Sequence, residues 1–212
     1  MCDIYLCMRR IEKIYYIAVA VLTTLFAMSC SNENDSVLTQ QQTNIERYLK
    51  NSHSPRLINE EEIAQSIEEE PQFYTRWGLD IYRYIATYYD EGRQDKPEIS
   101  LGTTFDITYT AYIFTGNKPK VQDMYATNDE ASIEELRALG LNTTYEWTTD
   151  PMRITLGETE LISGLETALQ GCREDDEVEI YLTYEAANGK HYVGKVPSKS
   201  PVMWMIKIVN VE

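Results

Sequence analysis

Basic residues are scarce in this chain of 212 residues. Nineteen lysines and arginines stand against 34 aspartates and glutamates, so the formal net charge at pH 7 is −15. Surfaces that hold nucleic acid or anionic lipid by charge need the opposite balance. We therefore expect no nucleic-acid partner and no direct electrostatic adhesion to a membrane. The length suits one compact domain with an N-terminal extension.

Cysteine and histidine are too few for the sites that usually need them. Of the four cysteines, only Cys172 lies beyond the first thirty residues, and a single thiol cannot form an intrachain disulfide. The two histidines, His53 and His191, are far apart and have no nearby cysteine or H-E-x-x-H pattern. These absences argue against a metal centre of any common type. We expect neither a metal nor another cofactor.

The motifs of several large enzyme classes are also missing. The chain has no G-x-S-x-G, no G-x-x-x-x-G-K-[ST] and no G-x-G-x-x-G. The sequence therefore gives no motif support for a serine hydrolase, a P-loop nucleotide enzyme or a dinucleotide-binding enzyme. Carboxylates are abundant, but no local pattern singles out an acid/base pair.

The first thirty residues have the pattern of an export signal. Basic residues between Arg9 and Lys13 precede an apolar run, residues 14–28, that is shorter than the about 20 residues of a spanning helix. The small residues before Cys30 resemble the lipobox of bacterial lipoproteins. The resemblance implies a signal peptide over residues 1–29, lipid on Cys30 and an anchor in the cell envelope. An uncleaved membrane anchor is the alternative.

Two N-terminal segments are expected to precede the main domain. Residues 30–44 are polar, which predicts a disordered tether, and their early acidic residues resemble signals that send lipoproteins to the outer membrane, facing the periplasm or the cell surface. Residues 45–77 are expected to be a helical extension. Within it, Asn59 followed by Glu62 has the spacing of a capping box.

From Gly78 onward the apolar pattern changes to a period of two, which is typical of strands. The order of the expected elements predicts an α+β fold, in which an antiparallel sheet wraps around one short helix and short N-terminal helices come first. We expect strands at 81–88, 103–114, 152–156, 178–184 and 202–211, with helices at 132–139 and 161–170.

The last fifty residues carry a resemblance to a known family. They begin Leu161-Ile162-Ser163-Gly164-Leu165-Glu166 and end on Met203-Trp204-Met205-Ile206-Lys207-Ile208. The order and spacing of these elements resemble the C-terminal half of the FKBP-type peptidyl-prolyl cis-trans isomerases. The resemblance extends from about residue 78 to residue 212, with an insertion at about 123–150.

Such enzymes need an apolar pocket rather than a charged catalytic group. Rotation about an X–Pro bond has a barrier of about 18–20 kcal/mol, while the cis and trans forms differ by only about 0.5–1 kcal/mol. A cavity that strips water from the amide favours the twisted, less polar state, and a nearby donor can assist. The resemblance assigns catalytic roles to Tyr109, Asp123, Leu161, Ile162, Leu165, Tyr192 and Trp204, and substrate binding to Met152, Asn188 and Val196.

Three positions depart from the family pattern. The family's Phe-Asp pair after the hairpin is replaced near Val121-Gln122-Asp123, so Asp123 serves only if the loop shifts by one residue. Leu165 takes the place of a tryptophan that floors the pocket in many members. Asn188 takes the place of a flap tyrosine that donates to the ligand carbonyl.

The resemblance implies a function and leaves alternatives. It implies an isomerase that acts on proline-containing polypeptide segments and assists the folding of exported proteins near the membrane. One alternative is a catalytically inactive binding module of the same fold. The other is a structural subunit of an outer-membrane complex that contacts protein partners through residues 123–150.

Overall fold

The computed structural model describes residues 34–142 and 144–212. The chain divides into two compact units, residues 1–40 and 41–212. The expected signal peptide and the lipidation site at Cys30 lie outside the described residues. Among the residues that are described, no helix is both long and apolar enough to cross a membrane.

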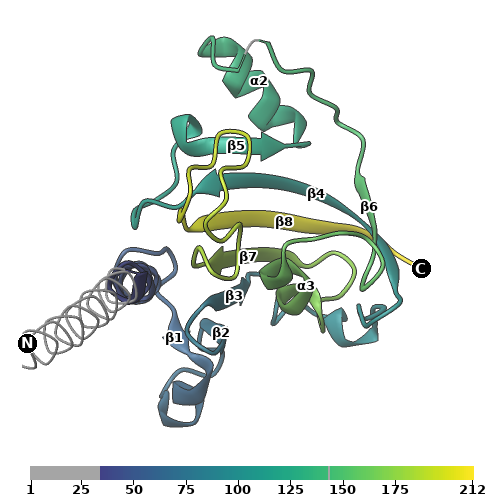
Figure 1. The fold of residues 1–212 in the computed structure, drawn as a ribbon. Helices are drawn as coiled ribbons and strands as arrows, with labels where there is room; N and C mark the ends of the chain where they lie inside the picture. Colours follow the sequence, from purple (N-terminus) through teal and green to yellow (C-terminus); the bar gives the residue numbers. More distant parts are fainter. Residues whose placement is uncertain (1–33, 143) are drawn as a thin grey trace, which may run out of the picture. The chain divides into compact units, whose positions relative to one another are not determined.

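Eight strands in the described part of residues 41–212 form one sheet (Figure 1). Its order is β1-β2-β3-β7-β8-β4-β5, and β6 pairs with the same edge of β4 as β5 does. Only β1 and β2 pair in parallel. The strands are β1 (Ile58–Asn59), β2 (Phe73–Trp77), β3 (Ile81–Ile85), β4 (Thr104–Ile113), β5 (Met124–Thr127), β6 (Met152–Thr155), β7 (Glu177–Leu182) and β8 (Val202–Val211).

The helices of this unit are short. The α-helices are α2 (Glu130–Ala138) and α3 (Ser163–Leu169), and the 3-10 helices are η1 (Glu60–Gln65), η2 (Arg93–Asp95) and η3 (Val121–Asp123). An additional helix covers residues 34–51. The expected α+β architecture, a sheet wrapped around one short helix, is confirmed.

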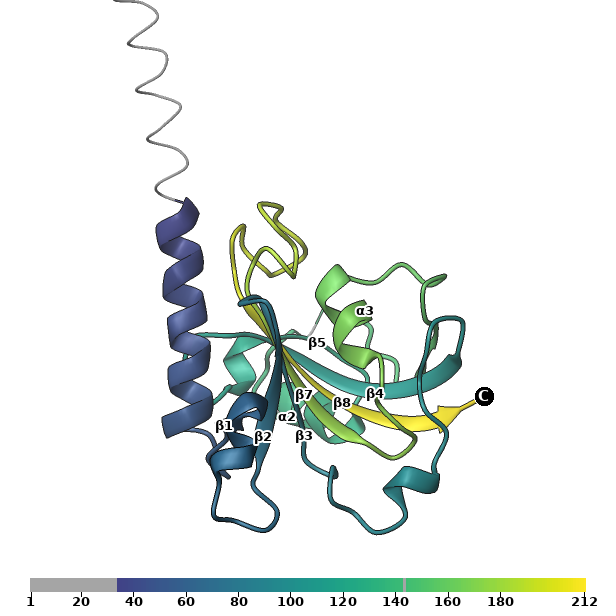
Figure 2. The ribbon, with the colours of Figure 1, turned by 90° about the horizontal axis from the view of Figure 1, so that it is seen from below.

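One face of the sheet packs on α3 and is called the α3 face below (Figure 2). Successive side chains of a strand point to opposite faces, so Ile107 and Tyr109 of β4 share this face with Val178 and Ile180 of β7. Leu165 and the rest of the buried side of α3 close the core over them. The fully buried members include Phe105, Leu156, Ala168, Leu169, Cys172, Leu182, Val202 and Ile208.

The opposite face of the sheet is covered by residues 41–51 of the N-terminal helix. Ile45, Tyr48 and Leu49 are buried there at helical spacing. Gln41 fixes the helix to the end of the sheet, because its side chain donates to the Lys199 carbonyl (2.8 Å) and accepts from the Tyr184 N–H (2.9 Å). The second core that results also contains Leu57, Tyr74, Tyr82, Tyr84, Phe114, Tyr181 and Met203.

The N-terminal segments differ from the expectation. Residues 34–44, expected to belong to a disordered tether, are helical. Within residues 45–77, the capping box of Asn59 and Glu62 is confirmed, but it opens the 3-10 helix η1 rather than an α-helix. The same stretch also supplies β1 and β2. β1 pairs with β2, and β2 forms a hairpin with β3, and the helical pattern predicted for residues 45–77 reveals neither pairing.

His53 links the loop after the N-terminal helix to the sheet. Its Nε2 lies 2.9 Å from Glu179 Oε2 and its Nδ1 lies 2.5 Å from the Pro55 carbonyl. Burial lowers the pKa of His53, but the hydrogen bond and charge of Glu179 outweigh it, and the pKa is raised. His53 therefore has a structural role in the second core.

Gly164 allows α3 to approach the sheet closely. Its N–H donates to the Ala186 carbonyl at 3.0 Å. A Cβ at this position would lie 2.6 Å from that carbonyl oxygen and 2.6 Å from a methyl carbon of Leu182. Because one of these atoms is backbone, the helix would have to move to admit a side chain.

We predict that Gly164→Ala lowers the free energy of unfolding by about 1–3 kcal/mol, the usual cost of overpacking. Helix propensity alone predicts the opposite sign, by up to about 1 kcal/mol. Urea unfolding followed by tryptophan fluorescence measures the change. Ser163→Ala, at the exposed neighbouring position, is the control and should have little effect. A Gly164→Ala chain as stable as the wild type would contradict the steric argument.

Candidate functional site

The candidate site is a group of partly exposed apolar side chains at the margin of the α3-face core. Five predicted residues pack on the buried core and remain partly accessible: Tyr109, Met152, Leu161, Ile162 and Trp204. They come from β4, β6, the turn before α3 and β8. Five of the ten residues predicted for the pocket therefore pack on one core, and two of them, Tyr109 and Trp204, are in direct contact.

An aromatic stack forms the centre of this group. Tyr109 of β4 and Trp204 of β8 lie diagonally across neighbouring strands, with ring centroids 4.9 Å apart and planes inclined by 29°. Tyr125 of β5 meets the Trp204 ring edge-on at 6.2 Å and 79°. Both geometries are favourable for aromatic pairs. The stack gives the site a broad, rigid apolar wall.

The two tyrosines of this wall are neutral hydrogen-bond donors. Burial, and to a smaller extent the neighbouring Tyr145, raises the pKa of Tyr109. Burial also raises the pKa of Tyr125 far above its usual value. The Tyr109 hydroxyl makes no hydrogen bond to any described residue. It is therefore free to donate to a bound carbonyl.

The Trp204 indole is a third donor at the same place. Its N–H is buried and has no acceptor in hydrogen-bonding geometry among the described residues. It lies close enough to the Tyr125 hydroxyl to lower the pKa of that phenol, against the larger effect of burial. Buried donors without a partner are rare in folded proteins. The Trp204 N–H therefore lies inside the wall next to the Tyr125 hydroxyl, and the Tyr109 hydroxyl is the donor that remains available to a ligand.

The start of α3 places the two aliphatic residues. Ile162 is the N-cap of α3 in an extended conformation, and its carbonyl accepts the N–H groups of Leu165 (2.9 Å) and Glu166 (3.3 Å). Ile162 therefore lies on extended backbone where the chain enters α3, and both aliphatic side chains pack on the α3-face core. Leu165, by contrast, is 2% exposed and belongs to the floor of the core rather than to an open wall.

Asp123 lies outside the aromatic stack. It belongs to η3, where its carboxylate accepts the Lys120 N–H at 3.3 Å. The residue after the hairpin that contacts Trp204 is instead Tyr125, and Ala126 follows it. A bulge in the β4–β5 pairing, between Ala111 and Tyr112, brings Tyr125 to that position. The carboxylate predicted at Asp123 is therefore not part of the aromatic stack.

The flap before β8 contributes less than expected. Val196 is buried in the α3-face core, and its backbone pairs with Val193. Tyr192 is 70% exposed and belongs to neither core. Asn188 is half-buried. Its backbone carbonyl, not its side-chain amide, accepts the His191 N–H at 3.1 Å. Of the three flap residues, only Val196 belongs to the α3-face core.

Asn128 is a positioning residue that the sequence did not single out. Its side-chain oxygen accepts the Tyr109 N–H at 2.6 Å, and its amide donates to the carbonyls of Ile107 (3.0 Å) and Asp150 (3.1 Å). A single amide therefore joins β4 to the segment before β6. All three partners are distant in sequence, so no local pattern marks this asparagine.

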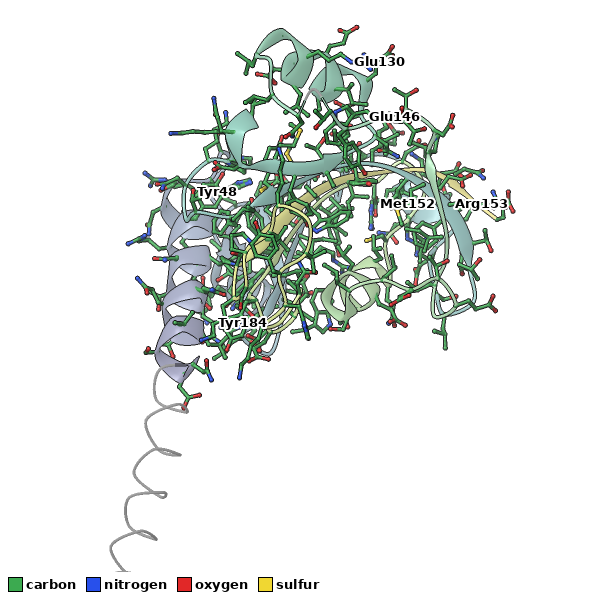
Figure 3. All side chains as sticks on the ribbon, turned by 45° about the horizontal axis from the view of Figure 1, so that its top comes forward. Tyr48, Glu130, Glu146, Met152, Arg153 and Tyr184 are labelled. Atoms are coloured by element: carbon green, nitrogen blue, oxygen red, sulfur yellow. The ribbon has the colours of Figure 1, made fainter. Side chains whose placement is uncertain are left out.

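A cleft of about 310 Å³ adjoins the stack. It lies between β4 and β5 on one side and residues 145–152 on the other, and Tyr109 and Met152 line it. In Figure 3, Glu146 and Met152 lie on the segment that leads from α2 to β6. The remaining lining residues are Thr127, Asn128, Tyr145, Thr148, Asp150 and Pro151. Within the described ranges, no three His, Cys, Asp or Glu residues are placed to hold a metal ion.

We predict that Asn128→Ala lowers the free energy of unfolding by roughly 2–4 kcal/mol, because three hydrogen bonds of about 0.5–1.5 kcal/mol each are lost at a buried position. Chemical denaturation measures the change. Asn117→Ala, at an exposed turn, is the control and should leave stability almost unchanged. A loss below about 1 kcal/mol would mean that the amide does not hold the two segments together.

The C-terminal part of the chain is similar to a known protein family. The family model of FKBP-type peptidyl-prolyl cis-trans isomerases matches residues 138–209, which include β6, α3, β7 and most of β8. The chain is also similar to a solved structure of a peptidyl-prolyl cis-trans isomerase from Pseudomonas syringae pv. tomato. The match covers 62% of this chain and 75% of the Pseudomonas chain, with 15% sequence identity and a TM-score of 0.42. No curated protein matches the sequence.

Proposed function

Over residues 138–209 the chain belongs to the FKBP-type peptidyl-prolyl cis-trans isomerase family, and from this premise we propose that it accelerates rotation about X–Pro bonds. The reaction would take place on the apolar group around Tyr109 and Trp204. The observation that carries the proposal is the stack of Tyr109, Trp204 and Tyr125 on the α3-face core, in which the Tyr109 hydroxyl makes no hydrogen bond to a described residue.

The chemistry needs only what this group provides. The amide nitrogen of an X–Pro bond loses its conjugation as the bond twists, and the charge separation of the planar amide falls with it. An apolar wall that excludes water favours the twisted state over the planar one. A phenol hydrogen aimed at the carbonyl oxygen can hold the substrate in place. No proton transfer and no cofactor enter this scheme.

A second candidate function is binding without catalysis. One observation favours it: Ala126, not an acid, follows the aromatic Tyr125, and the predicted Asp123 lies in η3. A chain of this kind would hold proline-containing segments on the same apolar group without accelerating their rotation. A structural role in an outer-membrane complex, with contacts through residues 123–150, is the remaining alternative.

The first test is a cis/trans isomerisation assay on residues 34–212, which keep both cores, with a panel of X–Pro peptides. We expect acceleration by the wild type and a loss of at least about tenfold in kcat/KM, or about 1.4 kcal/mol, for a Tyr109→Ala, Trp204→Ala double variant. Tyr112→Ala is the matched control, because Tyr112 lies on the same strand and the opposite face.

Three outcomes separate the candidates. Acceleration that the double variant loses supports an isomerase. Peptide binding without acceleration, from a chain that circular dichroism shows to be folded, supports the binding module. Equal losses in the double variant and in Tyr112→Ala would count against a site on the α3 face.

We also propose that the chain is lipid-anchored at Cys30 and acts on exported proteins at the outer membrane. This proposal rests on the basic, apolar and small-residue pattern that precedes the cysteine. Metabolic labelling with an alkyne fatty acid should mark the wild type and a Cys7→Ser control but not Cys30→Ser, and the latter should leave the membrane fraction. Labelling of Cys30→Ser would refute the assignment.

A further inference from the structure

We propose that the cleft beside Tyr109 binds a basic side chain, lysine or arginine, next to the proline of the substrate. This inference rests on the proposed function, because it specifies which X–Pro segments the site selects. The cleft is contiguous with the candidate site, since Tyr109 and Met152 belong to both. Consecutive Cα atoms are only about 3.8 Å apart, so a residue flanking a proline at Tyr109 reaches the cleft.

The cleft carries negative charge that the protein leaves unpaired. Glu146 makes no hydrogen bond or ion pair with any described residue. Asp150 accepts a side-chain hydrogen bond only from Thr148, at 3.1 Å. The nearest basic residue along the chain is Arg153, and it forms its ion pairs with Asp106 and Glu212 instead. The two carboxylates therefore lack a cation.

Aromatic surface accompanies this charge. Tyr145 is 64% exposed and packs on Trp147, with centroids 4.4 Å apart and planes inclined by 49°. A lysine or arginine combines an apolar stem with a cationic head, so it can contact an aromatic ring along its length and a carboxylate at its tip. A cleft of about 310 Å³ has room for such a side chain. An acidic peptide side chain would be repelled.

The walls of the cleft are held in a fixed relation. Asn128 is 3% exposed and bonds to Tyr109 on one wall and to the Asp150 carbonyl on the other. The position of Asp150 relative to the proline site is therefore set by a buried hydrogen-bond network. Preorganisation of this kind reduces the entropic cost of binding.

The experiment compares peptides that differ only beside the proline, with lysine, alanine or glutamate before it or after it. Residues 34–212 are assayed for isomerisation and, by calorimetry, for binding. At low ionic strength we expect the lysine peptide to have a kcat/KM about two- to fivefold above that of the alanine peptide, as for exposed ion pairs. Raising the salt to about 0.5 M should reduce this preference.

The decisive variant is Glu146→Gln with Asp150→Asn, which should lose the lysine preference while keeping the rate on the alanine peptide. Asp90→Asn with Glu91→Gln removes the same charge from an exposed turn after β3 and is the matched control. It should retain the preference. A preference that survives in the cleft variant would overturn the inference.

The remaining outcomes separate this inference from the proposed function. Equal rates on the lysine and alanine peptides would overturn the inference and leave the isomerase intact. If no peptide is accelerated, the proposed isomerase function is wrong, and the binding measured by calorimetry then decides whether the basic subsite exists. Tighter binding of the lysine peptide, lost in the cleft variant, would then support the subsite in a binding module, and equal binding would refute it.

Discussion

The register of β4 against β8 is the constraint on which the rest of the site depends. Tyr109 pairs with Ile206 and Ala111 pairs with Trp204, so the tyrosine and the tryptophan emerge on one face and meet diagonally. A bulge between Asp106 and Ile107 sets this register. Because side chains alternate, a slip of one residue would move both rings to the other face and remove the wall.

The sheet supports this wall because it is buried on both faces. α3 covers one face and residues 41–51 cover the other, where the second core is rich in tyrosine. Full burial of a large apolar side chain contributes about 1.5–3 kcal/mol, so Ile45, Leu49 and Leu57 stabilise the strands that carry the site. The N-terminal extension is therefore part of the folded domain, although it does not contact a substrate in the proposed function.

The proposed function uses two kinds of surface. In it, the apolar side chains of Tyr109, Trp204 and Ile162 would contact the proline ring and the desolvated amide. The cleft lined by residues 145–152 would discriminate among the flanking residues through its charge and its exposed aromatic surface. Leu165 is buried in the core, so the large, partly exposed ring of the site comes from Trp204 of β8.

The sequence by itself determined the elements whose signal is local. Periods of two and of three to four residues predicted β4, β8 and α3, although the helix was expected from residue 161 and begins at Ser163. Only the tertiary structure decided that Tyr125 rather than Asp123 reaches Trp204, because a bulge shifts the register there. It also decided the role of Asn128 and the pairing of β1 and β2. These depend on contacts between distant residues, whose partners no local pattern names.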